Sequence, residues 1–170
     1  MPTPRKPLPS QESLVRLLDY SVVTGHIYRR PEHARSCNNF PAGTITNAGY
    51  RCIRINNVRY LAHRLIWRMI TGEDPGQFEI DHIDRDKDNN AWHNLRLATR
   101  NQNQCNIGLN PRSTSQLKGI SFNKASGKWM ARICFKGNRQ CLGYFSTPEE
   151  AHDAYVIASG KIHREFSKVY

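Results

Sequence analysis

Five of the fourteen carboxylates in the chain lie between Glu79 and Asp88, although the protein as a whole carries a net charge of +11. Asp81 and His82 lie within this acidic stretch. A carboxylate combined with an amide oxygen suits Mg²⁺, which takes oxygen ligands, keeps several waters and is completed by a substrate phosphate. An imidazole beside such a cation can take a proton from an attacking water. These residue types indicate a hard-cation site in a basic protein.

Short elements are predicted on either side of these residues. Residues 78–81 alternate apolar and acidic side chains, which is typical of a half-buried strand with its polar side turned to a cleft. Residues 95–98 alternate in the same way and predict a second short strand. Residues 84–90 between them are rich in turn formers and predict a loop.

The two asparagines that follow are placed to complete the site. Thr99 can cap a helix that starts immediately after it, and Asn103 would project one turn along that helix, towards Asp81 and His82. Asn94 is placed to accept a hydrogen bond from His82, through its side-chain or its backbone oxygen.

The acidic run itself has a plainer interpretation. Asp84, Asp86 and Asp88 alternate with Arg85 and Lys87, so the pattern favours a solvated loop over direct metal ligation. The spacing also matches the start of a calcium loop, but the glycine at its sixth position and the glutamate at its twelfth are absent.

Two other histidines lie near these residues. His93 is a weaker alternative to Asn94 as the neighbour of the site. His63 starts a predicted helix over residues 63–70, where a packed role is favoured over contact with the site or a phosphate.

These motifs resemble the HNH nuclease family, in its phage and intron-homing branch. The resemblance covers about residues 50–107 and rests on several separate blocks. The blocks are Leu61-Ala62-His63-Arg64-Leu65-Ile66-Trp67, Asp81-His82, Asp88-Asn89-Asn90, Asn94-Leu95-Arg96 and Thr99-Arg100-Asn101-Gln102-Asn103. The resemblance implies a strand–strand–helix (ββα-metal) fold that cleaves a DNA phosphodiester, within an α+β chain.

The family's roles carry over to individual positions. By this resemblance His82 is the general base, Asp81 and Asn103 are the metal ligands, and Asn94 orients His82. Asn103 stands where the family name has a histidine, which favours Mg²⁺ or Mn²⁺ over zinc or nickel. One divalent metal ion, most simply Mg²⁺, is the expected cofactor.

Composition agrees with a nucleic-acid partner. The 25 Lys and Arg residues and the pI near 9.8 match a polyanion, and duplex DNA is the expected partner. The sequence shows neither a membrane span nor a signal peptide, so a cytoplasmic protein is expected, in an infected bacterial host cell if its origin is a phage. Five cysteines without a C-x-x-C pair indicate thiols.

The region before the acidic stretch predicts small elements. Ser10 is placed to cap a short helix, and Asn56-Asn57 suits a two-residue hairpin turn between strands over residues 50–55 and 58–61. Arg51 and Arg54 fall on opposite faces of the first of these strands, so no single basic face is predicted.

A second module is predicted after a linker over residues 108–116, which divides the chain into residues 1–107 and 117–170. Three strands separated by glycine-containing turns precede a helix that starts at Pro148 inside a capping box. We predict a three-stranded antiparallel sheet packed on one helix.

The last hairpin of that sheet is predicted to turn at Gly137-Asn138. This turn would place Lys136 opposite Arg139, and Cys134 opposite Cys141. Like charges directly opposite each other are destabilising, so Lys136 and Arg139 would indicate an anionic partner. The cysteine pair is expected to be reduced.

This module resembles the Apetala-two / ethylene-response-factor DNA-binding domain over nearly all of residues 116–170. The blocks that carry the resemblance are Lys118-Gly119-Ile120, residues 127–133, Leu142-Gly143-Tyr144-Phe145 and residues 147–155. The resemblance implies that the exposed sheet face enters a DNA major groove. Matching contact positions are Lys118, Ser121, Arg132, Cys134, Arg139, Cys141 and Tyr144; phosphate contacts are expected from Lys118, Lys128, Lys136 and Arg139.

The sequence thus predicts a homing-type DNA endonuclease. The alternative is a non-catalytic DNA-binding regulator on a nuclease fold, although Asp81, His82, Asn94 and Asn103 are all present. An RNA-binding or structural protein ranks lower, because the sheet face offers few aromatic side chains for stacking on bases.

Overall fold

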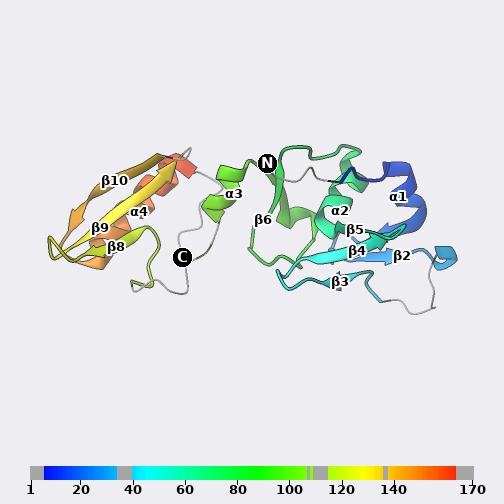
Figure 1. Ribbon diagram of the computed structural model, residues 1–170, viewed down its shortest axis with the longest axis horizontal. Helices are drawn as coiled ribbons and strands as arrows, with labels where there is room; N and C mark the ends of the chain where they lie inside the picture. Colours follow the sequence, from blue (N-terminus) through cyan, green and yellow to red (C-terminus); the bar gives the residue numbers. More distant parts are fainter. Residues whose placement is uncertain (1–5, 34–39, 107, 109–114, 136–137, 164–170) are drawn as a thin grey trace. The chain divides into compact units, whose positions relative to one another are not determined.

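The computed structural model describes the chain except for residues 1–5, 34–39, 107, 109–114, 136–137 and 164–170 (Figure 1). The chain divides into two compact units, Met1–Leu97 and Ala98–Tyr170. The boundary falls before the predicted linker, most of which lies outside the described residues. Among the described residues, no helix has the length and apolar character needed to cross a membrane.

The amino-terminal unit consists of short elements. In chain order they are α1 (Gln11–Leu17), β1 (Leu18–Tyr20), β2 (Ile27–Arg29), η1 (Pro31–His33), β3 (Thr44–Ile45), β4 (Arg51–Ile55), β5 (Val58–Leu61), α2 (Ala62–Thr71), β6 (Glu79–His82), η2 (Trp92–Asn94) and β7 (Leu95–Ala98). The strands form three small sheets, β1-β2, β3-β4-β5 and β6-β7.

Local signals explain where several of these elements begin and end. The Ser10 hydroxyl accepts a hydrogen bond from the backbone N–H of Ser13 and caps α1 as predicted. Asn56 and Asn57 adopt φ angles of 46° and 63°, so the predicted two-residue turn between β4 and β5 is confirmed. Gly72 ends α2 with φ 76°.

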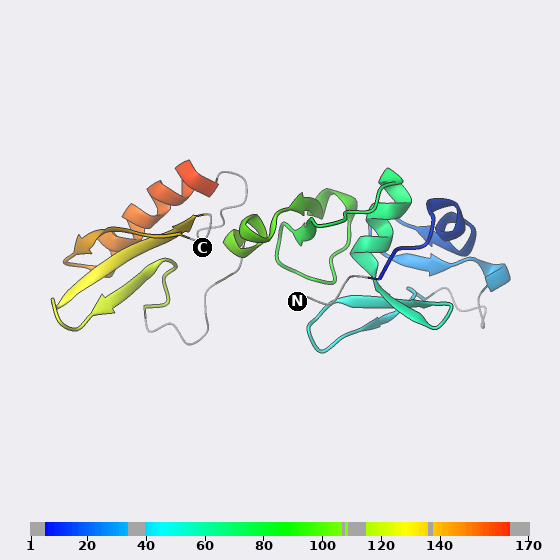
Figure 2. The ribbon, with the colours of Figure 1, turned by 45° about the horizontal axis from the view of Figure 1, so that its top comes forward.

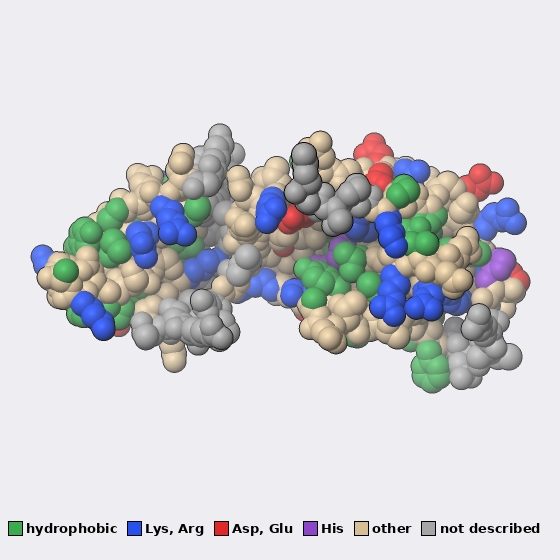
Figure 3. All heavy atoms as spheres, in the orientation of Figure 1, with side chains coloured by type: hydrophobic (Ala, Val, Ile, Leu, Met, Phe, Trp, Pro, Cys, Tyr) green, Lys and Arg blue, Asp and Glu red, His purple; other side chains and the backbone are tan. Residues whose placement is uncertain are grey.

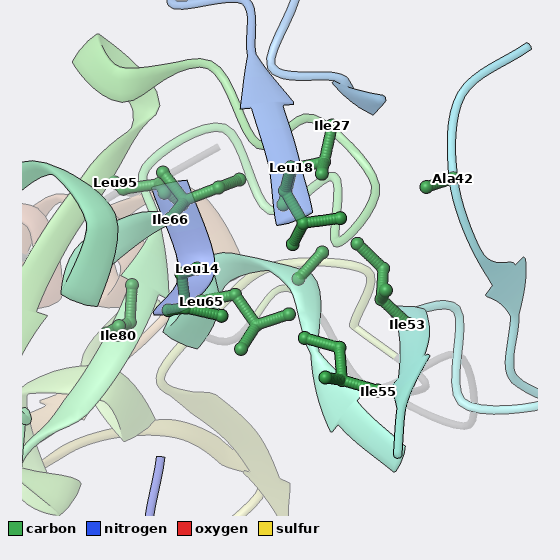
Figure 4. Close-up of a cluster of buried hydrophobic side chains, with 11 residues drawn as sticks. Leu14, Leu18, Ile27, Ala42, Ile53, Ile55, Leu65, Ile66, Ile80 and Leu95 are labelled. Atoms are coloured by element: carbon green, nitrogen blue, oxygen red, sulfur yellow. The ribbon is translucent and has the colours of Figure 1, made fainter. Parts of the chain in front are cut away.

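One hydrophobic core ties the strands β6 and β7 to the rest of the unit. Ile80 on β6 and Leu95 on β7 share this core with Leu65 and Ile66 of α2 (Figure 4). The other members come from α1, β1, β2, β4, α2 and the segment before β3: Leu14, Leu18, Ile27, Ala42, Ile53, Ile55 and Ala62. Because burial of apolar surface is the main stabilising term, this shared core anchors the two strands.

The carboxy-terminal unit has α3 (Arg100–Asn106), β8 (Ile120–Asn123), β9 (Lys128–Phe135), β10 (Asn138–Phe145) and α4 (Pro148–His163). The three strands form an antiparallel sheet in the order β10-β9-β8. Helix α4 lies along one face of this sheet (Figure 2) and buries Ala151 and Tyr155. Thr147 and Glu150 make the predicted capping box at its start.

The predicted register of the β9–β10 hairpin was wrong. Asn138 pairs with Phe135 and is the first residue of β10, so it belongs to the strand rather than to the turn. Cys134 therefore lies opposite Arg139, and Cys141 lies opposite Arg132. A bulge between Cys141 and Gly143 then shifts the register again. Lys136 lies outside the described residues, as does Gly137.

Candidate active site

Asp81 and His82 end strand β6, and both side chains are almost completely buried, with 4% and 5% of their surface exposed. Arg96, on β7, contacts the Oδ2 atom of Asp81 through Nε at 2.9 Å and through Nη2 at 2.7 Å. A buried carboxylate requires a positive partner, because its desolvation is otherwise costly. The two strands therefore bring together a carboxylate, its arginine partner and an imidazole.

The imidazole of His82 lies 3.1 Å, measured from Nε2, from the Oδ1 atom of Asn90, which is 1% exposed. The amide of Asn90 can take only one orientation here, because its Nδ2 donates to the carbonyl of Asp88 at 2.9 Å. Oδ1 thus faces His82 as an acceptor, and Nε2 of a neutral imidazole must carry the proton. Nδ1 then keeps its lone pair and can act as a base.

Asn94, the residue predicted to orient His82, makes its hydrogen bonds to the neighbouring loop. Its Oδ1 accepts from the backbone N–H of Asp84 at 3.0 Å, and its Nδ2 donates to Oδ1 of Asp84 at 2.9 Å and to the carbonyl of Asn89 at 2.7 Å. Its backbone carbonyl accepts from the N–H of Ile83 at 2.9 Å. Asn94 thus holds the backbone immediately after His82.

Sequence reasoning did not single out Asn90 as the residue that contacts His82. Asn90 stands among turn-forming residues, where a polar side chain is normally solvated. Its burial follows from packing against the amino-terminal hairpin, which the local pattern does not show.

The acidic residues of the loop hydrogen-bond within it. Asp84 accepts from the N–H of Asp86, and Asp86 accepts from the N–H of Asp88, each an Asx turn. Partial burial raises the pKa of Asp84, but hydrogen bonds from Asn94, Asn89 and Asp86 outweigh this effect and hold its pKa below the usual value. These contacts agree with the loop interpretation of the acidic run.

Two aromatic residues border His82. The ring of His63, at the start of α2, packs edge-on against His82 with a centroid separation of 5.1 Å, and Tyr50 lies 6.1 Å from His82. His63 is 5% exposed, so it is packed, but its packing partner is His82 and it therefore also contacts the candidate site. Burial raises the pKa of Tyr50, and the charges of Glu79 and Asp81 raise it further.

Residues from the start of the chain hold the loop from outside. The hydroxyl of Tyr20 donates to the carbonyl of Asn90 at 2.9 Å. Arg51 binds both oxygens of Asp88, each at 2.7 Å. Gly25 packs so closely that an added Cβ would lie 2.2 Å from the backbone nitrogen of Ala91. Strands β1, β2 and β4 thus help to position the residues around His82.

The predicted metal ligands are an aspartate and an asparagine from different units. Asp81 is described above, and Asn103 lies on α3, half-buried, with its N–H bonded to the carbonyl of Thr99. Thr99 caps that helix together with Gln102, as predicted. In the part of the chain that the structure describes, no three His, Cys, Asp or Glu side chains gather as a metal site. One carboxylate plus one amide still has the oxygen donors that suit Mg²⁺.

The predicted DNA contacts lie in the carboxy-terminal unit. Lys128, Arg132 and Arg139 are exposed, and Tyr144 is 51% exposed. On the same sheet, Ser121 accepts from Arg132 Nη2 at 3.3 Å. Cys134 and Cys141 are exposed free thiols, Lys118 is half-buried, and Lys136 lies outside the described residues.

Residues 60–105 match the family model described as HNH endonuclease. The match spans α2, β6, β7 and most of α3, and therefore includes Asp81, His82 and Asn94. These residues form an HNH endonuclease domain. The domain is that of a nuclease enzyme. The residues before Tyr60 and after Cys105 lie outside the match.

Two viral proteins are similar to parts of the chain. The chain is 35% identical over 77 residues to Protein 3.8 of Escherichia phage T7, which covers 45% of this chain and 64% of that protein. It is 31% identical over 106 residues to an uncharacterized HNH endonuclease of Acanthamoeba polyphaga mimivirus, which covers 62% of this chain and 54% of that protein. The chain thus spans less than two thirds of either relative. No solved structure matches it significantly.

Proposed function

We propose that the protein is a metal-dependent endonuclease that hydrolyses phosphodiester bonds of double-stranded DNA, of the homing type found in phages and mobile elements. The observation that carries the proposal is the environment of His82. Its imidazole is buried, and Asn90 accepts from Nε2, so Nδ1 is the unprotonated nitrogen of the neutral ring. An imidazole so oriented suits a general base at neutral pH.

In the proposed reaction Nδ1 of His82 takes a proton from water, and the resulting hydroxide attacks the phosphorus. The 3′ oxygen leaves, so the products carry 5′ phosphate and 3′ hydroxyl ends. Asp81 and Asn103 would hold one divalent cation, Mg²⁺ or Mn²⁺, which supplies charge stabilisation for the phosphate and the leaving oxygen when bound. Arg96 forms an ion pair with the Asp81 carboxylate within the buried site.

Asn94 and Asn90 divide the positioning of His82 between them. Asn94 accepts from the backbone N–H of Ile83, which fixes the main chain next to His82, whereas Asn90 contacts the imidazole itself. Asn94 therefore has a supporting role in the proposed reaction. The HNH resemblance implied that Asn94 orients the ring of His82, and we propose that Asn90 does so instead.

The carboxy-terminal sheet is proposed to hold the duplex, in the manner of the Apetala-two-like domains that it resembles. Support comes from the exposed positive side chains of Lys128, Arg132 and Arg139 on a surface that α4 does not cover. Phosphate contacts by such residues give affinity without fixing a sequence. Lys118, Ser121, Lys136 and Tyr144 complete the proposed DNA-binding set.

The decisive experiment uses supercoiled plasmid, Mg²⁺ and the full chain. Wild type should nick or linearise the plasmid, and EDTA should abolish cleavage. We expect His82→Ala to lose cleavage by roughly a hundredfold or more while it keeps its DNA affinity, because general-base catalysis contributes roughly 10² to 10⁴ in rate. The ratio of open-circle to linear product reports whether one strand or both are cut.

Loss of both cleavage and DNA affinity in His82→Ala would instead indicate a structural role for this residue. Tight binding by wild type without cleavage, over a range of DNA sequences and with Mg²⁺, Mn²⁺ and Zn²⁺ each supplied, would support the non-catalytic regulator.

A further inference from the structure

Several arginines of the amino-terminal unit form ion pairs with aspartates. The ion pairs are Arg30–Asp19, Arg51–Asp88, Arg64–Asp74 and Arg96–Asp81, with N···O distances between 2.7 and 3.0 Å. These pairs hold loops and strands together, and their guanidinium groups are already neutralised. They are therefore poor candidates for contact with a polyanion.

Three other arginines of this unit are arranged differently. Arg54 on β4 lies directly opposite Arg59 on β5, and both side chains are exposed. Arg29, at the end of β2, is also exposed and donates from Nη2 to the backbone carbonyl of Arg54 at 2.6 Å. Within the described part of the chain, none of the three forms an ion pair. We call Arg29, Arg54 and Arg59 the arginine cluster.

The fold holds the arginine cluster on the outer side of the small sheet. Ile53 and Ile55 on β4 point into the core, with 0% and 5% of their surface exposed, so Arg54 between them points outward. The turn at Asn56-Asn57 then fixes Arg59 as the cross-strand partner of Arg54. Figure 3 shows Lys and Arg side chains gathered over the end of the amino-terminal unit where β2, β3 and β4 lie.

Like charges placed directly opposite each other on a sheet are destabilising. A pair of arginines at such positions, with a third arginine beside them, thus costs stability in the isolated protein. Bound phosphates would remove that cost and release counterions, which is the main source of affinity for duplex DNA. Guanidinium groups also match phosphate oxygens in geometry.

We infer that the arginine cluster is a second DNA-binding surface, which contacts phosphates of the duplex from the amino-terminal unit. It lies outside the residues that match the HNH family and outside the carboxy-terminal sheet. The inference rests on the proposed function for the identity of the polyanion. The contacts are to the backbone, so they add affinity equally for all sequences.

The test compares Arg54→Gln/Arg59→Gln with Arg30→Gln, each in a His82→Ala background. Arg30 follows Arg29 in the chain but is paired with Asp19, so Arg30→Gln is the control for loss of a positive charge that is already in an ion pair. Binding of a labelled DNA duplex is measured by fluorescence anisotropy over a range of salt concentrations, with thermal melting of each variant.

We expect the double variant to bind roughly tenfold to thirtyfold more weakly at physiological salt, and the slope of log K against log salt to fall by about two. Its melting temperature should stay the same or rise, because a like-charge pair has been removed. Weaker binding without loss of stability is a result that a structural role for these arginines does not produce.

Suppose that the wild type binds and cleaves DNA, but the slope of log K against log salt is unchanged in the double variant. This result would overturn the DNA-binding role of the arginine cluster and leave the proposed function intact. The same holds if Arg30→Gln lowers affinity as much as the double variant does. Absence of DNA binding and cleavage in the wild type would overturn the proposed function as well. Loss of affinity for anionic phospholipid vesicles, with DNA binding unchanged, would assign the cluster to a membrane surface and overturn the inference.

Discussion

Asn90 keeps its amide in one orientation because Nδ2 donates to the carbonyl of Asp88, and Oδ1 consequently faces Nε2 of His82. A side chain that accepts from one ring nitrogen decides which nitrogen remains a base. Asn90 is therefore a positioning residue for His82 in the proposed reaction.

Asn90→Ala should slow single-turnover cleavage by roughly tenfold to a hundredfold, the usual cost of losing the partner that orients a functional histidine. Because the alanine no longer accepts from Nε2, nitrogen NMR of labelled protein should show His82 as a mixture of tautomers. The wild type should show a single form protonated at Nε2. A single unchanged tautomer in a folded Asn90→Ala variant would contradict this role.

Asp84 provides a pH test that does not depend on catalysis. Its pKa is lowered in the folded protein, so the folded state releases this proton more readily than the unfolded chain. The stabilisation is fully present above the usual carboxyl pKa and is lost as the pH falls through the lowered value. Asp84→Asn should thus destabilise the protein at neutral pH and have less effect in acid. Thermal melting from neutral to acidic pH measures this, and an equal effect at all pH values would refute it.

At the scale of elements, the strands were easier to predict than the contacts between them. The alternation of residues 95–98 predicted β7, and Thr99 and Thr147 correctly marked the starts of α3 and α4. These signals are local, because a capping side chain bonds to backbone only a few residues away.

Some of the contacts that sequence reasoning did not give are long-range. The phenol of Tyr20 reaches Asn90 across seventy residues, and neither residue type reveals its partner. The predicted register of the β9–β10 hairpin was wrong for a related reason. In the sequence, Gly137-Asn138 and Lys136-Gly137 are both acceptable as two-residue turns. Which of them forms depends on packing along the whole strand pair.

The turn between β1 and β2 offers a test of the amino-terminal contribution to the site. Gly25 has φ 73°, and an added Cβ would meet the backbone of Asn90 and Ala91 at 2.2 to 3.0 Å. Gly25→Ala should destabilise the protein by about 2 kcal/mol or more, since backbone strain and a clash combine. It should also slow cleavage, because residues 90 and 91 must move.

Gly76→Ala is the matched control for this substitution. Gly76 also has a positive φ, 55°, but the nearest atom to an added Cβ lies at 3.9 Å, so only the strain of about 1 kcal/mol is expected. Chemical denaturation and single-turnover cleavage measure both effects. Equal losses in the two variants would mean that the contact of Gly25 with the loop has no role.

At the scale of the whole molecule, the chain divides into two compact units, and the predicted linker over residues 108–116 follows the boundary between them at Leu97 and Ala98. A fragment of residues 1–107 retains Asp81, His82 and Asn103, so it should still cleave plasmid DNA at high enzyme concentration. Its affinity for duplex DNA should fall by roughly tenfold or more, because the phosphate contacts of the carboxy-terminal sheet are lost. Binding by the fragment as tight as by the full chain would remove the carboxy-terminal unit from the proposed DNA interface.

Two units that both contact DNA, as proposed, would also change how long the protein stays on its product. Once one unit holds the duplex, the other meets the same molecule at an effective concentration that reaches the millimolar range for a short flexible connection. Release then requires both units to dissociate at the same time, so the residence time on DNA exceeds that of either unit alone. With the proposed contacts, we expect dissociation rather than bond cleavage to limit repeated turnover.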